Sequence, residues 1–158
     1  MTVYGKNNSI CGVGVDMVEI ERIAKSMENP RFLTRVFSIE EQSYFESRSF
    51  PIQTIAAGFA AKEAFSKAIG TGVRGFSLQD VSVRHDALGK PILAFSGPLA
   101  QRVREEGWHF ELSLSHCREY AVAFVVASKL QEQIAKLSDG ETPNQNRCPE
   151  TKCSEEYL

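Results

Sequence analysis

The stretch Pro51–Gly72, PIQTIAAGFAAKEAFSKAIGTG, carries the longest helical pattern of this 158-residue chain. Its large side chains recur at Ile55, Phe59 and Ile69 with helical spacing, and the two closing glycines can take the positive φ that ends a helix. Proline suits the start of a helix, where a missing N–H costs nothing. The stretch therefore predicts one long helix, which we place at the centre of the fold.

Shorter elements precede it. Val13 and Val15 alternate with small residues and predict a strand that ends at Asp16, directly followed by a helix that stops before Pro30. A short helix is expected after Pro30, and Ser38–Glu41 has the Ser-x-x-Glu form of a capping box. This part of the chain is therefore mostly helical.

Strand patterns dominate the second half of the chain. Two short apolar runs flank the turn 86–89 and predict a hairpin, and one more helix is expected over 98–106. The segment 109–115 alternates apolar and polar residues, whereas 120–127 is almost continuously apolar and should be a central, buried strand. The order of elements predicts an α+β fold with an antiparallel sheet packed against helices.

Composition limits the function classes. The net charge of −2 and the pI of about 6 do not suit a duplex nucleic-acid binder, which usually shows a strongly basic face. No stretch approaches the roughly 20 apolar residues of a membrane span, and the start lacks the apolar core of a signal peptide. We expect a cytoplasmic protein with one domain over 1–128 and a polar, mobile tail over 129–158.

The four cysteines lie in unrelated contexts and are expected to be free thiols in a reducing compartment. Cys148 and Cys153 are close in sequence, but no matching histidine pair accompanies them. A structural zinc site there is disfavoured, because zinc takes about four ligands.

Asp16 interrupts an apolar strand, so its carboxylate must be solvated, paired or metal-bound. Aspartate is also a favoured N-cap, and a helix is expected to follow. Position alone favours capping, and a metal or catalytic role remains open beside it.

Glu63 lies four residues before Lys67 and could form an ordinary surface ion pair with it. Its alanine neighbours instead permit close approach of a ligand. Mg²⁺ typically takes one or two carboxylates and completes its shell with water and substrate phosphates. The pattern is thus also typical of a magnesium and phosphate site, with Lys62 and Lys67 neutralising phosphate.

Two further groups are ambiguous. His116 lies at a strand end beside Cys117, and adjacent side chains rarely achieve the geometry of a nucleophile pair. Arg22, Arg31 and Arg35 could simply be a solvated helical face. They could equally dock an acidic partner.

Three segments together resemble the holo-acyl-carrier-protein synthases, which are phosphopantetheinyl transferases. The segments are Gly12–Asp16 with Glu19–Ile23, Phe59–Gly72, and Leu114–His116 with Tyr120–Ala123. Gly89-Lys90-Pro91 is a further agreement. The resemblance covers residues 10 to 128, and the second segment is its most specific part.

The resemblance implies the phosphopantetheinyl transferase fold and transfer of 4'-phosphopantetheine from coenzyme A to a serine of apo-acyl carrier protein, in support of fatty acid biosynthesis. It implies Mg²⁺ as cofactor and a homotrimer with active sites at the subunit interfaces. Its implied residues are Asp16 and Glu63 as metal ligands, Glu63 and Lys67 in catalysis, Lys62, Ser66, Gly70, Pro91 and His116 for coenzyme A, and Arg22, Arg31 and Arg35 for acyl carrier protein. Either Glu63 or a metal-bound water is the candidate base.

One position departs from the resemblance. The family usually has an arginine before the aromatic residue of the helix motif, and this chain has Gly58. A phosphate contact is then either absent or supplied elsewhere, for example by Arg74. Two rival functions stay open, namely another Mg²⁺-dependent nucleotide or phosphoester enzyme and a non-catalytic binder of acyl carrier protein.

Overall fold

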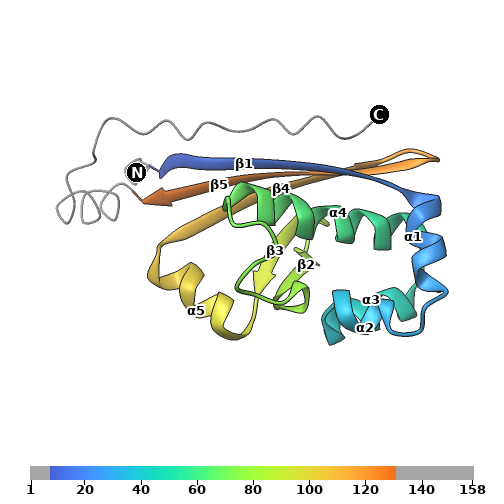
Figure 1. Cartoon of the computed structure of the whole chain (residues 1–158). Helices are drawn as coiled ribbons and strands as arrows, with labels where there is room; N and C mark the ends of the chain where they lie inside the picture. The colour runs from blue at the N-terminus through green and yellow to red at the C-terminus, as the bar shows by residue number, and fades with distance from the viewer. Residues whose placement is uncertain (1–7, 131–158) are drawn as a thin grey trace, which may run out of the picture.

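A computed structural model describes residues 8–130 of the chain. The elements follow in the order β1 (Asn8–Glu19), α1 (Ile20–Met27), α2 (Phe32–Val36), α3 (Ile39–Ser47), α4 (Ile52–Ala68), the 3-10 turn η1 (Leu78–Asp80), β2 (Val81–His85), β3 (Pro91–Phe95), α5 (Gly97–Glu105), β4 (Trp108–His116) and β5 (Tyr120–Leu130) (Figure 1). The α+β class and the long helix over Pro51–Gly72 are confirmed.

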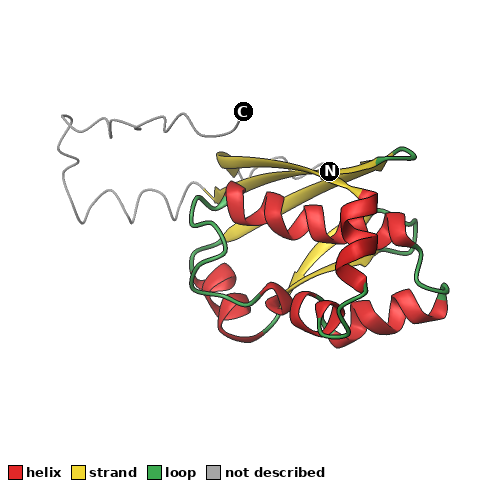
Figure 2. Cartoon of the chain, turned by 45° about the vertical axis from the view of Figure 1, so that its right-hand side comes forward, coloured by secondary structure: helices red, strands yellow, loops and turns green. Residues whose placement is uncertain are grey.

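The strands form two antiparallel sheets. The larger sheet has the order β1-β5-β4, so that β5 is central as predicted, and β2 pairs with β3 in the predicted hairpin. The described helices lie on one side of the three-stranded sheet, with α4 directly against it (Figure 2). The site residues of β1 and α4 are therefore held by direct packing of helix on sheet.

Two glycines allow this packing. A Cβ at Gly12 would lie 2.0 Å from the carbonyl oxygen of Ala68, and a Cβ at Gly14 would lie 1.9 Å from that of Ala64. No side chain fits at such distances, so only glycine lets the backbone of β1 rest on the backbone of α4. This contact brings Asp16, two residues further along β1, beside the middle of α4.

The capping role considered for Asp16 is wrong. β1 continues to Glu19, because its ladder with β5 runs on from the pair Asp16–Ala123 to the pair Glu19–Tyr120. α1 begins only at Ile20, and its N-cap, Glu19, makes no side-chain capping bond. The apolar residues after Asp16 have helical spacing, but residues 17–19 pair with β5 and therefore form a strand. By contrast, the predicted capping box of Ser38 and Glu41 is confirmed.

The burial predicted for β5 holds for one face only. Ala121, Ala123, Val125 and Ala127 face the helices and are completely buried. The opposite face of the sheet carries exposed apolar side chains, here called the outer apolar face: Ile10, Val13, Val15, Met17 and Phe124. Val15 lies opposite Phe124 in the β1–β5 register, so these side chains are contiguous across two strands.

The strand β5 also extends past the predicted domain boundary at residue 128. Lys129 is buried, its ammonium lies 4.1 Å from the ring centroid of Trp108, and it pairs with Glu106 at 3.2 Å. Lys129 therefore belongs to the packed domain. The rest of the predicted tail, with Cys148 and Cys153, lies outside the described residues. Within 8–130, no helix is long and apolar enough to cross a membrane.

Glu106 makes the stability of this end of the domain depend on pH. The hydrogen bond from Arg102, with those from Trp108 and Lys129, lowers the pKa of Glu106 to about 2, against the opposing effect of burial. The pKa of Glu106 in the folded protein lies below its value in the unfolded chain. Ionised Glu106 therefore stabilises the fold above about pH 4.5, and this stabilisation is lost as the pH falls towards 2. About a third of the side chain is exposed, so we expect about 1 kcal/mol after solvent screening.

The expected result is that Glu106→Gln lowers the free energy of unfolding at pH 7 and that the difference from the unmodified protein shrinks at pH 3. Urea titrations at both pH values measure it. Glu105→Gln on the exposed side of α5 is the matched control and should change neither value by more than about 0.5 kcal/mol. An equal loss from Glu106→Gln at both pH values would contradict the prediction.

Candidate active site

Asp16 of β1 and Lys67 of α4 form the best-defined contact of the candidate site. The Lys67 ammonium donates to Asp16 Oδ1 at 2.8 Å and to the carbonyl oxygen of Val15 at 3.0 Å. The Asp16 side chain is 15% exposed, whereas that of Lys67 is 52% exposed. Asp16 is thus shielded and oriented, and Lys67 still reaches solvent.

The surface ion pair considered between Glu63 and Lys67 is not formed, because Lys67 points to Asp16 instead. Within residues 8–130, the Glu63 carboxylate has no hydrogen-bond or ion-pair partner. Burial raises the pKa of Glu63, and the negative charge of Asp16 raises it further; Lys67 and Arg22 oppose the shift. Glu63 is therefore an uncommitted, half-buried carboxylate beside a second one.

This pair of carboxylates fits a magnesium ion. Asp16 keeps Oδ2 uncommitted and Glu63 keeps both oxygens, which supplies the one or two hard oxygen ligands that Mg²⁺ takes from a protein. No group of three or more His, Cys, Asp or Glu side chains that could hold a metal occurs in residues 8–130. A complete protein cage is thus absent there, and an ion would need water and substrate oxygens.

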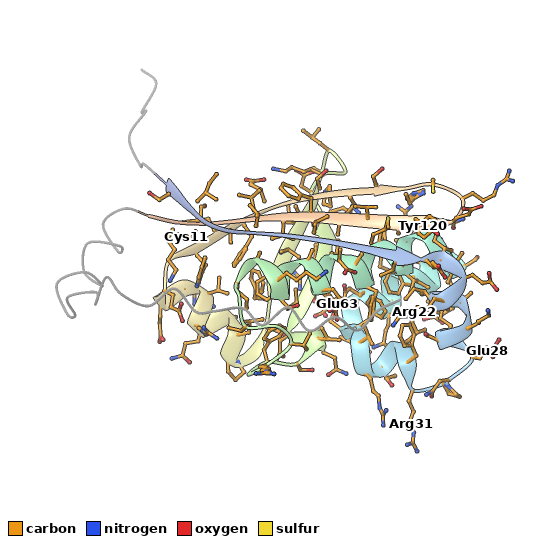
Figure 3. The ribbon with its side chains drawn as sticks, turned by 45° about the horizontal axis from the view of Figure 1, so that its top comes forward. Cys11, Arg22, Glu28, Arg31, Glu63 and Tyr120 are labelled. Carbon is orange, nitrogen blue, oxygen red and sulfur yellow. The ribbon has the colours of Figure 1, made fainter. Side chains whose placement is uncertain are left out.

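Arg22 belongs to the surroundings of this pair. It lies on α1, which packs on α4, and its charge acts on Glu63. Figure 3 shows Arg22 and Glu63 on neighbouring elements and Arg31 pointing away from the body of the molecule. Arg31 is the N-cap residue of α2, Arg35 lies in the last turn of that helix, and both side chains are exposed. Of the three arginines, Arg22 is the one whose charge acts on the acid pair.

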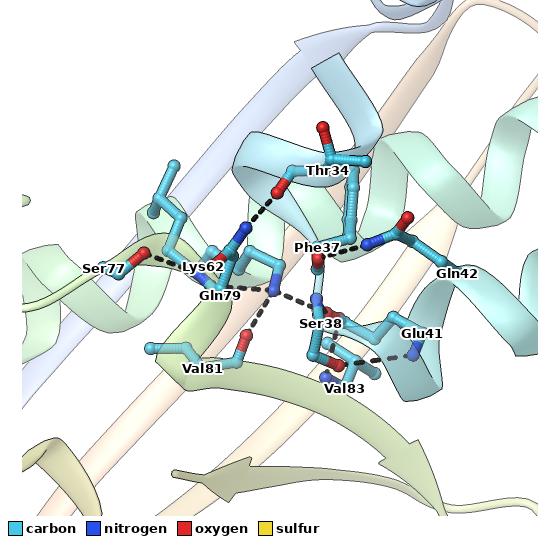
Figure 4. Close-up of polar contacts among 11 residues, drawn as sticks. Thr34, Phe37, Ser38, Glu41, Gln42, Lys62, Ser77, Gln79, Val81 and Val83 are labelled. Atoms are coloured by element: carbon cyan, nitrogen blue, oxygen red, sulfur yellow. Dashed lines mark hydrogen bonds and ion pairs between the residues drawn. The ribbon is translucent and has the colours of Figure 1, made fainter. Parts of the chain in front are cut away.

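Lys62 does not lie where the resemblance implied. Its side chain is completely buried, and the ammonium donates to Glu41 Oε2 at 2.7 Å and to the carbonyl oxygens of Leu78 and Val81 (Figure 4). Burial lowers the pKa of Lys62, against the attraction of Glu41. Lys62 is engaged inside the domain and cannot neutralise a bound phosphate from there.

Glu41 is the residue that the sequence did not single out beyond its helix cap. Oε1 accepts from the backbone N–H of Val83, and Oε2 accepts from that of Ser38 as well as from Lys62. One carboxylate thus joins the start of α3, the middle of α4 and strand β2. The capping-box pattern showed the local bond, but the partners 21 and 42 residues away carry no local signal.

Ser66 is also buried, and its hydroxyl donates to the Glu63 carbonyl within α4 at 2.8 Å. It presents no surface to a ligand. Cys117 and His116 do not form a nucleophile pair either: Cys117 Sγ accepts from the Tyr120 N–H at 3.4 Å, and no bond within 8–130 joins it to the imidazole.

A separate pocket of about 260 Å³ contains two of the implied coenzyme A residues, Pro91 and His116. Gly58 lines it as well, whereas Arg74 does not. A Cβ at Gly58 would lie 3.2 Å from Phe37 Cε1, so the glycine lets the ring pack against α4. The sequence missed three polar lining residues, Tyr44, Thr54 and His85, because α3, α4 and β2 meet here only in the folded chain.

The pocket and the acid pair lie on different flanks of α4. Gly58 and Glu63 are five residues apart, which is about 140° around a helix with 3.6 residues per turn. Gly70, implied for coenzyme A, lies beyond the far end of the helix and has φ +73°. Lys67 thus accompanies the acid pair, Gly70 follows the C-terminal end of α4, and Pro91 and His116 line the pocket on the other flank.

Comparison with known proteins identifies the family of the chain. Residues 12–125 match the family model of the 4'-phosphopantetheinyl transferase superfamily. The chain is similar to holo-[acyl-carrier-protein] synthases of Clostridium botulinum (46% identity; 74% of this chain, 96% of the relative) and Fusobacterium nucleatum (42%; 74% and 98%).

Solved structures give the same result. The fold is similar to that of the holo-[acyl-carrier-protein] synthase of Neisseria meningitidis (TM-score 0.73, 38% identity; 77% of this chain, 100% of that chain). It is also similar to the Bacillus anthracis protein, solved in complex with coenzyme A (3',5'-ADP) (TM-score 0.65, 36%; 76% and 97%). The chain therefore belongs to the holo-[acyl-carrier-protein] synthases of the 4'-phosphopantetheinyl transferase superfamily.

Proposed function

We propose that this protein transfers the 4'-phosphopantetheine group of coenzyme A to a serine of apo-acyl carrier protein, in support of fatty acid biosynthesis. The observation that carries the proposal is the pair of carboxylates, Asp16 and Glu63, with Lys67 bound to one of them and the other uncommitted. The products are holo-acyl carrier protein and adenosine 3',5'-bisphosphate.

Glu63 and Lys67 have different roles in the proposed transfer. The serine oxygen forms a bond to the phosphorus that carries the pantetheine, and the bond from that phosphorus to the bridging pyrophosphate oxygen breaks. Glu63 accepts the serine proton, directly or through water, because its carboxylate has no polar partner within the described residues. Lys67 stabilises negative charge on the leaving phosphate while it orients Asp16.

Asp16 and Glu63 would hold Mg²⁺, which neutralises charge on the pyrophosphate when it is bound. Lys62 and Ser66 do not enter this proposal, since both are buried and engaged inside the domain. Pro91, His116 and Gly70 remain as the proposed contacts to coenzyme A.

The test is intact-mass analysis of apo-acyl carrier protein incubated with the protein, coenzyme A and Mg²⁺. We expect the mass of one phosphopantetheine to appear on the carrier, and the signal to be lost when Mg²⁺ is chelated. A folded protein that binds the carrier without ever modifying it would refute the enzyme and favour the non-catalytic binder. Binding of coenzyme A without transfer would favour another Mg²⁺-dependent enzyme.

We also propose that the working form is a homotrimer with the active site between subunits. Two features support it. The outer apolar face presents side chains that no described helix covers, including Val15 and Met17, which are 55% and 63% exposed. The residues proposed to contact coenzyme A fall into two groups: Gly70 lies beyond the C-terminal end of α4, and Pro91 and His116 line the pocket. A site that uses both groups is naturally built from two chains.

A charged substitution on the outer apolar face is expected to lower the molecular mass of the protein in solution. Light scattering should give three times the chain mass of 17.6 kDa for the unmodified protein and the single-chain mass for Val15→Asp, because a buried carboxylate without a partner disrupts an apolar interface. Leu88→Asp at the tip of the β2–β3 hairpin, 96% exposed, is the control and should leave the trimer intact. A monomeric unmodified protein would refute the assembly.

The exposed arginines of α2 should affect docking of the acidic carrier and not coenzyme A. We expect Arg31→Glu and Arg35→Glu each to raise the KM for apo-acyl carrier protein about tenfold at low salt, since charge steers association. The KM for coenzyme A should stay within about twofold. Arg104→Glu on α5 is the matched control. Equal effects of all three variants would leave α2 without a special role.

A further inference from the structure

Two planar groups contact the ring of Tyr44, a residue that lines the pocket. The imidazole of His85 is stacked on the ring of Tyr44, with 5.3 Å between centroids and 25° between planes. The guanidinium carbon of Arg48 lies 4.7 Å from the centroid of the same Tyr44 ring. Tyr44 is thus held by two neighbours and in turn orients His85, which ends strand β2.

The His85 ring is open to a further stacking partner. It is an exposed side chain that lines the pocket, and Tyr44 is its only aromatic neighbour within residues 8–130. Opposite His85 in the β2–β3 register is Pro91, which lines the same pocket. The imidazole therefore offers a flat, preorganised surface beside a residue proposed to contact coenzyme A.

The lining of the pocket favours a neutral ring over a phosphate. Phe45, Ala57 and Leu114 supply apolar surface, and no lysine or arginine lines the pocket. The one carboxylate in its wall, Glu41, is already bound to the buried Lys62. The hydroxyl of Thr54 has no partner within the described residues and could bond the edge of a base. Apolar walls with a few polar groups are typical of a site for a heteroaromatic ligand.

We infer that His85 is the stacking platform for the adenine base of coenzyme A and of the product adenosine 3',5'-bisphosphate, with Tyr44 as the residue that positions it. The inference rests on the proposed function, because it names the part of the same co-substrate that this pocket receives. Stacking on an aromatic side chain needs only the π-face of the base, so either protonation state of His85 can serve.

Calorimetric titration with adenosine 3',5'-bisphosphate tests it. We expect His85→Ala to raise the Kd about 5- to 150-fold, the range that corresponds to the loss of one base–aromatic stack. His85→Phe, which keeps a flat ring without N–H groups, should stay within about threefold of the unmodified protein. The Kd for 4'-phosphopantetheine, which has no base, should not respond to either change. Arg84→Ala, at the adjacent exposed position of β2, is the matched control.

The outcomes separate the two proposals. If His85→Asn preserves affinity and His85→Phe loses it, a hydrogen bond to phosphate operates and the stacking inference is overturned. If the unmodified protein modifies the carrier but His85→Ala binds the bisphosphate normally, the inference fails and the proposed function stands. If the unmodified protein neither binds the bisphosphate nor modifies the carrier, both fail. Upfield shifts of the adenine H2 and H8 resonances that disappear in His85→Ala would support the stack directly.

Discussion

Replacing Glu63 by glutamine is expected to slow transfer to acyl carrier protein by about 10²- to 10⁴-fold, the range for loss of a positioned general base. Glutamine keeps the size of the side chain but neither accepts a proton nor offers a charged oxygen to Mg²⁺. The native Glu63 carboxylate is half-buried and has no polar partner within residues 8–130, so its oxygens are available for both tasks. The rate is measured by intact mass with saturating coenzyme A.

Two variants sharpen this prediction. Glu46→Gln, at an exposed position of α3, is matched in chemistry and should leave the rate unchanged. Asp16→Asn removes the other carboxylate. A comparable loss of transfer rate in this variant would show that Asp16 and Glu63 act together in one site. The melting temperature of Glu63→Gln should equal that of the unmodified protein, since the Glu63 side chain has no described polar partner to lose. A rate within threefold of normal would exclude Glu63 from the chemistry.

Replacing Lys62 by methionine is expected to lower the free energy of unfolding by about 3–5 kcal/mol, the cost of leaving one charge of a buried pair without its partner. The Glu41 carboxylate is 3% exposed and would keep only its two backbone donors. Small domains are stable by about 5–15 kcal/mol, so this loss is a large fraction of the total. Urea unfolding followed by circular dichroism measures it.

The double variant Glu41→Gln with Lys62→Met tests the mechanism of that loss. It removes both charges, so it should be more stable than Lys62→Met alone. Lys25→Met is the surface control: Lys25 pairs with Glu21 at 2.9 Å, but both side chains are at least 70% exposed, so the variant should change the free energy of unfolding far less than Lys62→Met. Lys62→Met with a loss below 1 kcal/mol would show that the buried lysine is neutral or dispensable.

Local patterns predicted most elements because each depends on residues close in sequence. The long helix, the Ser38–Glu41 capping box and the β2–β3 hairpin are all present. Where the prediction was wrong, at the end of β1, the competing force was long-range: residues up to Glu19 pair with β5 about 100 residues later in the chain. A periodicity of apolar residues cannot report such a partner.

The motif Gly12–Asp16 shows how sequence and tertiary structure share the site. The resemblance named Asp16 and Glu63 together, but their proximity depends on the contact of β1 with α4, which only the two glycines permit. For the same reason, Lys67 pairs with Asp16 and not with Glu63, the partner that its position four residues along the helix suggested. Proximity across this contact outweighs the weak pairing of residues four apart on a helix.

The sequence by itself determined the class of fold, the long helix and the family, because these are written in periodicity and in motifs of adjacent residues. Only the tertiary structure decided which of the two lysines is available to the proposed site, since Lys67 reaches solvent beside Asp16 and Lys62 lies buried on Glu41. It also decided that Tyr44 and His85 share a pocket with Pro91. The burial of a side chain and its hydrogen-bond or ion-pair partners depend on which surfaces meet when segments far apart in the sequence pack together. The residues around one position do not reveal these contacts.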